Sequence, residues 1–241
     1  MRRVGKLREG VRKIRDLCVE RVYATHNRSK TIEKAIAACL GGMGERGLGL
    51  NVGAGRSRLH ARVLNLDIAP TEELDVCGNA EALPFKDGSF AVVLTQETLE
   101  HVRDPELALA EIRRVLHEQG VFYCQVPFVI GYHPGPADFQ RWTREGIVEL
   151  LRRCGFNCFE VGISVGPATG CYRIAVEFWA VVMSSFWPRL YLPVKGLLAL
   201  LLFPVKLLDP LMLRSPQADR IAGGYYVVAR KACPTSTAST S

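Results

Sequence analysis

Two short stretches of the sequence hold the residue types that a nucleoside-binding site requires. The first is the turn of Gly53, Ala54 and Gly55, which follows the apolar run at 48–52. Glycine has no β-carbon, so the backbone amides of such a turn can approach a ligand closely. The second is Asp67, which directly follows the run VLNL. A carboxylate at the carboxyl end of a strand grips ribose hydroxyls in nucleotide-binding sheets, so the two stretches predict one site.

The connection between these two runs limits the kind of ligand. Residues 53–62 leave room for only a short crossover between parallel strands, near the minimum length that such a connection tolerates. A pyrophosphate normally binds at the amino terminus of a full helix. The short connection therefore favours a ligand without phosphate groups.

The elements that must position these residues alternate between strands and helices. Apolar runs predict strands at 48–52, 63–66, 74–77, 90–94, 121–126, 156–164 and 225–230. A helix is predicted over 104–118, capped by Asp104 and ended by Gly120, and a second helix from Thr143 to Gly155. The side chains expected to face the sheet are Leu107, Ala110, Ile112, Val115 and Leu116 from the first helix and Ile147, Leu150 and Leu151 from the second. This pattern is typical of a single α/β domain with additions.

The chain resembles the class I S-adenosylmethionine-dependent methyltransferases, and within them a methyltransferase type 11-like domain. The consecutive motifs of that family are similar to LNVGAG, LNLD, GNAEALPF, FAVVLTQETLEHV, DPELALAEIRRVLHEQG and VFYCQVP. The resemblance covers residues 48–163 and returns at GGYYVVARK, which is similar to the last strand of the family. It implies a Rossmann-like, seven-stranded, mostly parallel sheet with an antiparallel last strand.

The resemblance also implies S-adenosyl-L-methionine as cofactor and a role for each matching residue. The glycine turn would line the methionine part, Asp67 would bind the ribose diol and Ile68 would pack on the adenine. Asn51 stands where the family usually has an acid; its amide accepts a hydrogen bond but forms no ion pair with the ammonium group of the cofactor. The full implied set is Asn51, Gly53, Ala54, Gly55, Asp67, Ile68, Asn79, Ala80 and Gln96.

Two histidines are the candidates for catalysis. Methyl transfer from a sulfonium is an in-line displacement, so a base is needed only when the acceptor arrives protonated, and His101 and His133 could supply it. The segment ExxEH at 97–101 is similar to that of metal-assisted O-methyltransferases. This likeness implies Glu97, Glu100 and His101 as ligands of a divalent cation, Mg²⁺ or Mn²⁺, with His133 as a further ligand or the base. In the alternative interpretation, the Glu-His pair only caps the next helix.

The net charge of +7 belongs to the amino-terminal arm. Residues 1–34 hold 11 Lys and Arg against 4 Asp and Glu, and the rest of the chain is balanced. Apolar residues recur at helical spacing at Val4, Leu7, Val11, Ile14 and Cys18. This basic helix could cover the cofactor site or lie on an anionic membrane. Nucleic acid is disfavoured because no aromatic residues alternate with the basic ones.

The segment 165–222 is an insertion before the last strand, and its centre, 174–213, is the most hydrophobic part of the chain. A single crossing of a bilayer is not expected, because prolines and charges interrupt the apolar runs and the flanking strands share one sheet. The sequence predicts a helical hairpin that covers the sheet, enters one membrane leaflet or forms a dimer interface. The eight cysteines show neither zinc nor disulfide spacing, which favours a cytoplasmic setting. The segment 174–213 and the basic amino-terminal helix predict peripheral contact with the membrane.

These observations predict five segments. They are a basic helical arm at 1–44, a cofactor-binding core at 45–164, the hydrophobic insertion at 165–222, the last strand at 223–232 and a disordered tail at 233–241. The predicted function is methylation of an oxygen on an amphipathic or lipid-linked acceptor at the membrane surface. The alternatives are a soluble small-molecule methyltransferase whose hairpin dimerises, and a non-catalytic module that binds the cofactor.

Overall fold

The computed structural model describes residues 30–232, which fall into two compact units. One contains residues 34–127, 133–162 and 225–232, and the other contains 30–33, 128–132 and 163–224. Most of the predicted basic arm, with Val4 to Cys18, and the tail at 233–241 lie outside the described residues. The helix α2 (Lys30–Gly41) ends at the pair Gly41 and Gly42.

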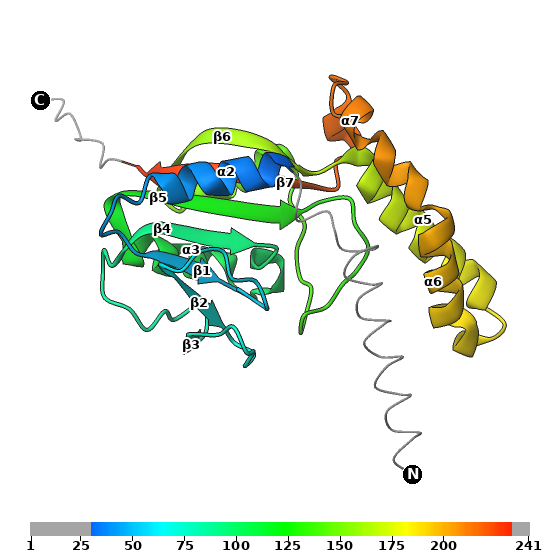
Figure 1. The fold of residues 1–241 in the computed structure, drawn as a ribbon, viewed down its shortest axis with the longest axis horizontal. Helices are drawn as coiled ribbons and strands as arrows, with labels where there is room; N and C mark the ends of the chain where they lie inside the picture. The colour runs from blue at the N-terminus through cyan, green and yellow to red at the C-terminus, as the bar shows by residue number, and fades with distance from the viewer. Residues whose placement is uncertain (1–29, 233–241) are drawn as a thin grey trace, which may run out of the picture. The chain divides into compact units, whose positions relative to one another are not determined.

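Seven strands form one sheet, in agreement with the predicted fold class. They are β1 (Gly49–Val52), β2 (Val63–Asp67), β3 (Val76–Cys77), β4 (Phe90–Gln96), β5 (Leu116–Pro127), β6 (Phe156–Val165) and β7 (Gly224–Lys231). Their order is β3-β2-β1-β4-β5-β7-β6 (Figure 1). The strands β1 to β5 pair in parallel, and the last strands are antiparallel. Because β1 is buried on both faces, it reads as an apolar run without alternation.

The helix α3 (Pro105–Val115) begins as predicted and ends earlier. The carboxylate of Asp104 accepts a hydrogen bond from the backbone nitrogen of Leu107, and Pro105 occupies the first turn. The predicted helix extended to 118, but Leu116 has extended backbone angles and begins β5 by pairing with Phe90. The strand ladder therefore takes the residues that helical periodicity assigned to the last turn.

The predicted inward face of α3 was partly wrong. Leu107 is 47% exposed and Ala110 is also exposed, whereas Ala108 and Leu109 are buried with Ile112. Apolar residues stand at both 107 and 109, so the sequence fits two helical phases, and the one that also buries Pro105 and Ile112 is adopted.

The second predicted helix is confirmed as α4 (Arg144–Arg153). Thr143 caps it by accepting from the backbone nitrogen of Gly146 at 3.0 Å, and it buries the three predicted side chains. Between α3, α4 and the sheet lies the core. Its members include Leu50, Val93, Leu109, Ile112, Phe122, Leu151 and Phe156.

The hydrophobic insertion is helical, as predicted. It consists of α5 (Pro167–Ser184), η4 (Pro188–Leu190), α6 (Tyr191–Leu201), η5 (Phe203–Leu208), α7 (Asp209–Met212) and η6 (Ala218–Ile221). The helices α5 and α6 lie side by side as a hairpin (Figure 1). The hydroxyl of Tyr172 joins them by donating to the backbone oxygen of Ala199 at 2.9 Å.

Among residues 30–232, no single helix has the length and hydropathy of a membrane span. One bent pair, Pro188–Leu201 with Phe203–Met212, meets the criteria together, with an angle of 42° at the break.

The start of α5 is held by a residue from far along the chain. Gly166, at the N-cap, has no side chain, so Asp209 supplies the cap: its carboxylate accepts from the backbone nitrogen of Ala168 at 2.8 Å and from the hydroxyl of Thr169 at 2.5 Å. A β-carbon on Gly166 would lie 2.2 Å from a carboxylate oxygen of Asp209, so only glycine leaves room for this cap.

Candidate functional site

A cavity of about 600 Å³ lies at the carboxyl ends of β1, β2 and β4. Ligands of parallel α/β sheets bind at these strand ends, and the volume falls within the range of small-molecule sites. The predicted residues that line it are Gly53, Gly55, Asp67, Ile68, Asn79, Ala80, Glu97 and His101. The two stretches that the sequence assigned to one site therefore face one cavity.

The glycine turn needs glycine for geometric reasons. Gly53 has a φ of +70° and Gly55 a φ of +55°, both in the left-handed region. A β-carbon on Gly53 would lie 2.3 Å from the side chain of Thr98. Thr98 fixes the same turn by donating its hydroxyl hydrogen to the backbone oxygen of Val52 at 3.1 Å. The turn is consequently packed on one side and open to the cavity on the other.

Asp67 is oriented by two backbone amides. One carboxylate oxygen accepts from the backbone nitrogen of Gly55 at 2.8 Å, and the other accepts from that of Ala69 at 2.9 Å. Each carboxylate oxygen has two acceptor sites, so both oxygens keep capacity to accept from the hydroxyls of a diol. The first of these bonds also ties the glycine turn to the end of β2.

The far wall of the cavity comes from the loop after β3. Asn79 has its side-chain oxygen turned to the backbone nitrogen of Glu81 at 3.0 Å, which closes a tight turn. Arg114 on α3 holds this loop from behind, since its guanidinium donates to the backbone oxygens of Leu83 and Phe85. The same guanidinium pairs with Glu111, whose pKa it lowers by hydrogen bonding.

Three of the implied cofactor residues lie outside the lining. The side chain of Asn51 is buried and donates to the side-chain oxygen of Asn65 at 3.2 Å, which joins β1 to β2. Ala54 is buried in the turn, and Gln96 pairs in register with Gln125 at the end of β4. For Asn51, Ala54 and Gln96, contact with a cofactor stays a prediction.

The structure adds lining residues that the sequence did not indicate. They are Glu81, Thr98, Val102, Arg103, Gly135, Pro136, Ala137 and Phe139. Several come from the loop after β5, whose Gly and Pro content marked it as a loop without showing that it returns to the cavity. Its position is fixed by a hydrogen bond from the backbone nitrogen of Phe139 to the backbone oxygen of Glu100 at 2.8 Å.

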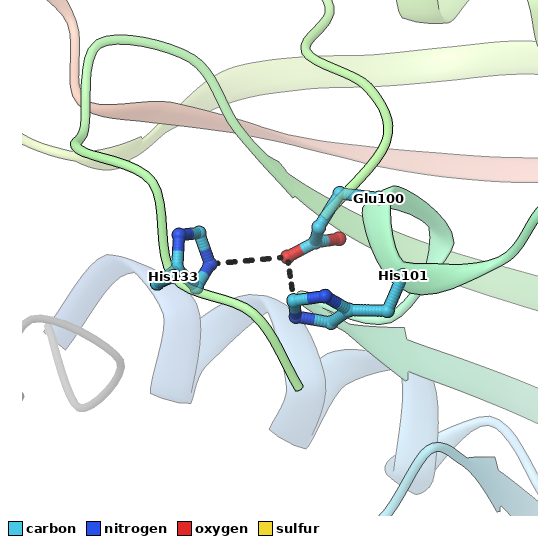
Figure 2. A group of neighbouring side chains, drawn as sticks. All are labelled: Glu100, His101 and His133. Atoms are coloured by element: carbon cyan, nitrogen blue, oxygen red, sulfur yellow. Dashed lines mark ion pairs between the residues drawn. The ribbon is translucent and has the colours of Figure 1, made fainter. Parts of the chain in front are cut away.

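Glu100, His101 and His133 form a cluster beside this cavity (Figure 2). One carboxylate oxygen, Oε1 of Glu100, lies 3.6 Å from Nε2 of His101 and 3.7 Å from Nε2 of His133. The two imidazole rings are almost perpendicular, with centroids 5.3 Å apart. Glu100 and His101 belong to the short helix η3 (Leu99–His101), and His133 comes from the loop after β5.

Glu97 does not join this cluster, although the sequence placed it among the metal ligands. It lines the cavity instead, and its φ of +51° lies in the left-handed region that side-chain-bearing residues rarely adopt. Strained backbone of this kind gathers at functional sites.

Each imidazole is held through its other nitrogen. Nδ1 of His101 lies 2.5 Å from the backbone oxygen of Ala137; a carbonyl only accepts, so this nitrogen carries the hydrogen and Nε2 keeps a lone pair. Nδ1 of His133 lies 3.2 Å from a guanidinium nitrogen of Arg141. Asp138 accepts from the backbone nitrogen of His133 at 2.9 Å and is paired with Arg141.

The electrostatics of the cluster follow from burial and from these pairs. Burial raises the pKa of the Glu100 carboxyl, with His133 acting in the opposite direction and Glu97 raising it further. Hydrogen bonds from Arg141 lower the pKa of Asp138 to about 2. Asp138 is thus ionised and Arg141 is charged, which fixes the loop that carries His133.

Comparison with known proteins agrees with this geometry. A family model described as a methyltransferase domain matches residues 46–124. A protein of Mycolicibacterium smegmatis, named a probable S-adenosylmethionine-dependent methyltransferase, is 33% identical over 86 residues, covering 33% of this chain and 34% of that protein. An uncharacterized 37.1 kDa protein from a Streptomyces fradiae transposon is 45% identical over 51 residues, covering 21% and 14%. The matches thus span about a third or less of these relatives.

Solved structures share the fold. Phosphoethanolamine N-methyltransferase 2 of Haemonchus contortus, in complex with phosphomonomethylethanolamine and S-adenosylhomocysteine, has a TM-score of 0.53 at 15% identity, covering 90% of this chain and 57% of that one. A chain from the Haloferax volcanii complex between the Trm112 methyltransferase activator and a methyltransferase has a TM-score of 0.51 at 18% identity, covering 91% and 94%. The sheet order and the family match over residues 46–124 together support a class I S-adenosylmethionine-dependent methyltransferase.

Proposed function

We propose that the chain binds S-adenosyl-L-methionine in the cavity at the ends of β1, β2 and β4 and transfers its methyl group to an acceptor oxygen. The observation that carries the proposal is the convergence of Asp67 and the Gly53–Gly55 turn on one cavity of about 600 Å³. Asp67 would bind the ribose diol, Ile68 would cover the adenine, and Asn79 and Ala80 would meet its edge. The exposed side chain of Ile68, 62% accessible, has the apolar character that an aromatic base would cover.

A base that could accept the proton of an acceptor hydroxyl lies at the cavity. His101 lines the cavity, and its Nε2 carries the lone pair because Nδ1 donates to Ala137. A hydroxyl is protonated at neutral pH, so it needs such a base during transfer, whereas a free amine does not. This supports oxygen as the methylated atom, with His101 as the base and His133 as the second candidate.

The hairpin supports an amphipathic or lipid-linked acceptor. Large apolar side chains are exposed along both of its long helices, and on α6 only Ala199 is buried. The exposed set includes Phe178, Trp179, Val181, Val182 and Met183 on α5, Leu192, Leu197, Leu200 and Leu201 on α6, and Phe186 and Trp187 in the turn between them. At 100° per residue these positions cover roughly half of the circumference of each helix. Surroundings on several sides suit a membrane leaflet better than a single protein face.

Charges inside the hairpin are neutralised internally. Lys195 pairs with Glu177, and Lys206 lies over the ring of Tyr172 at 5.3 Å. Asp209 is used as the cap of α5. Apart from the exposed Arg189 in η4, the surface that remains is therefore mainly apolar. The helix α6, with 11 residues, rises about 16 Å, close to the hydrocarbon thickness of one leaflet. An enzyme held there would reach an amphipathic or lipid-linked acceptor.

Calorimetric titration of the full chain with S-adenosylhomocysteine tests the cofactor site. Wild-type protein is expected to bind one equivalent, and Asp67→Asn is expected to weaken binding at least about tenfold, since two charge-assisted hydrogen bonds are lost. Glu118→Gln, an exposed carboxylate away from the cavity, is the matched control and should bind as wild type. Binding that is absent, or equal in Asp67→Asn, would reject the proposal.

A transfer assay separates the enzyme from a non-catalytic cofactor-binding module. Methyl transfer from labelled cofactor to lipid extract is expected from wild type and lost in His101→Ala. Flotation with phosphatidylcholine and phosphatidylglycerol vesicles then tests the membrane. Protein that stays with the aqueous fraction and sediments as a dimer would favour a soluble enzyme with a dimerising hairpin.

A further inference from the structure

The cluster of Glu100, His101 and His133 has the geometry of a metal site that differs from the one the sequence implied. We propose that these three side chains bind one divalent transition-metal ion, of the zinc, iron(II) or manganese class, through one carboxylate and two imidazole nitrogens. Glu97 is not a ligand. The binding itself is independent of the proposed function, and only the use of the ion in methyl transfer rests on it.

The separations between Glu100 and the two histidines are longer than those of ordinary hydrogen bonds. Nε2 of each histidine lies 3.6 or 3.7 Å from the same oxygen of Glu100, whereas an N–H···O hydrogen bond spans about 2.7–3.2 Å. Ligands of one zinc ion, each bound at about 2.1 Å, are roughly 3.4 Å apart in a tetrahedron. The three ligand atoms all lie within 4.8 Å of one another, so a small convergence brings them to one ion.

The carboxylate that all three groups share is fully buried. Glu100 has no exposed surface, and neither of its carboxylate oxygens makes a hydrogen bond in the part of the chain that the structure describes. Leaving an ionised carboxylate buried without hydrogen bonds costs several kcal/mol. A divalent cation held between the carboxylate and the two imidazoles would offset that cost.

The ring of His101 is held as a metal-bound histidine is. A ligating histidine usually donates its other N–H to a carbonyl or a carboxylate, which fixes the ring. His101 donates to the backbone oxygen of Ala137. For His133 such a bond to Asp138 is not in place, because the carboxylate oxygen of Asp138 lies 3.6 Å from Nδ1. Arg141 also reaches this nitrogen, so binding through Nε2 requires the tautomer that Asp138 accepts.

The ligand types select the class of metal. Magnesium prefers oxygen ligands and a nearly complete octahedron, which two imidazoles do not favour. Two histidines and one carboxylate suit catalytic zinc and non-haem iron(II), and they leave coordination positions for a further ligand. Because His101 also lines the cofactor cavity, an acceptor hydroxyl in that cavity could fill such a position. With an ion bound, Nε2 of His101 would be a ligand and no longer a base, and the ion itself would lower the pKa of the hydroxyl and aid its deprotonation.

Titration of chelator-treated full-length protein with Co²⁺ and Zn²⁺ tests the proposal. One ion per chain is expected, with the visible absorption of Co²⁺ bound to nitrogen and oxygen ligands. Glu100→Gln and His133→Asn should each weaken binding at least about tenfold. His117→Asn, an exposed histidine on β5, is the control and should bind as wild type. An excess of Mg²⁺ should not displace the bound ion.

Cofactor binding, measured in parallel by calorimetry, reports on folding. Glu100 and His133 do not line the cofactor cavity, so both variants should retain S-adenosylhomocysteine binding while losing the ion. Wild-type protein that takes up no Co²⁺ or Zn²⁺, or variants that bind the ion as tightly as wild type, would overturn the metal site. Either result leaves the proposed cofactor site standing, so the two proposals fail separately.

Discussion

The sheet core and the helical hairpin use similar amino acids with opposite outcomes. In the core, Phe122 has no exposed surface and its ring packs on Phe156 with centroids 5.1 Å apart. In the hairpin, Phe186 is 85% exposed and Trp187 is 69% exposed. The core closes on itself because strands and helices bring apolar faces together from several sides. The apolar cluster buried within the hairpin is small, with Tyr172, Val176 and Ala199 as its buried members.

This difference separates the apolar side chains that stabilise the fold from those that are available for binding to another surface. Apolar side chains that are buried stabilise the fold. Those that stay exposed contribute favourable free energy only when a membrane or another protein surface covers them. Matched substitutions in the two regions should therefore change different measurements.

The largest contrast is expected from one substitution made in both regions. Phe122→Ala should lower the free energy of unfolding by about 3–5 kcal/mol, because it leaves a cavity in the core. Phe186→Ala should change it by less than about 0.5 kcal/mol. Urea unfolding followed by circular dichroism measures both. Comparable losses would show that the hairpin side chain is covered by protein.

Binding to lipid vesicles tests whether the exposed side chains of the hairpin contact a membrane. Replacing both Phe186 and Trp187 by serine should weaken partition into phosphatidylglycerol-containing vesicles at least about a hundredfold, as each buried aromatic contributes about 1.5–3 kcal/mol. The melting temperature in the absence of vesicles should stay the same. Partition equal to that of wild type would remove these two side chains from the membrane contact.

The next effect concerns the two glycines of the cavity. Gly53→Ala should destabilise the protein by about 3 kcal/mol, because it adds a steric clash with Thr98 to the strain of a left-handed backbone. Gly55→Ala meets no atom within 4 Å and should cost only about 1 kcal/mol of backbone strain. Equal unfolding midpoints for the two variants would contradict the packing of Thr98 against the turn.

The smallest effect is a pH dependence in the sheet unit. Arg114 lowers the pKa of Glu111, so the unfolded chain binds a proton at higher pH than the folded chain does. The stabilisation is present above the unfolded value, about 4.3, and is lost as the pH falls through the lowered folded value. Glu111→Gln should reduce the difference in the free energy of unfolding between pH 7 and pH 4 by less than about 1 kcal/mol. Urea unfolding of the wild type and of the variant at pH 7 and at pH 4 measures this difference. An equal difference in both proteins would assign the pH dependence to other carboxylates.

Local motifs predicted the sheet and half of the site. The order of LNVGAG, LNLD and FAVVLTQ gave the strands, since each turn residue directly follows its strand in the sequence. Asp67 and the glycine turn could be joined because parallel strands bring their carboxyl ends to one edge. The phase of α3 could not be read, because apolar residues at 107 and 109 fit different faces equally well.

Contacts that depend on loop paths were beyond the sequence. His133 stands 33 residues from Glu100, and only the fold of the loop after β5 brings their side chains together. Likewise, the residues around Asn51 in the sequence do not show that its side chain is hydrogen-bonded to Asn65. Nor do the neighbours of Glu97 show that it faces the cavity instead of the cluster. Side-chain orientation at the end of a strand depends on neighbours that are distant in sequence.

The most direct measurement is a crystal structure of the full chain with S-adenosylhomocysteine. The account predicts the ribose hydroxyls within hydrogen-bond distance of the Asp67 carboxylate, the adenine against Ile68 and the homocysteine beside Gly53. A nucleoside bound at another edge of the sheet, or a cavity that stays closed at saturating ligand, would contradict the assignment of this site.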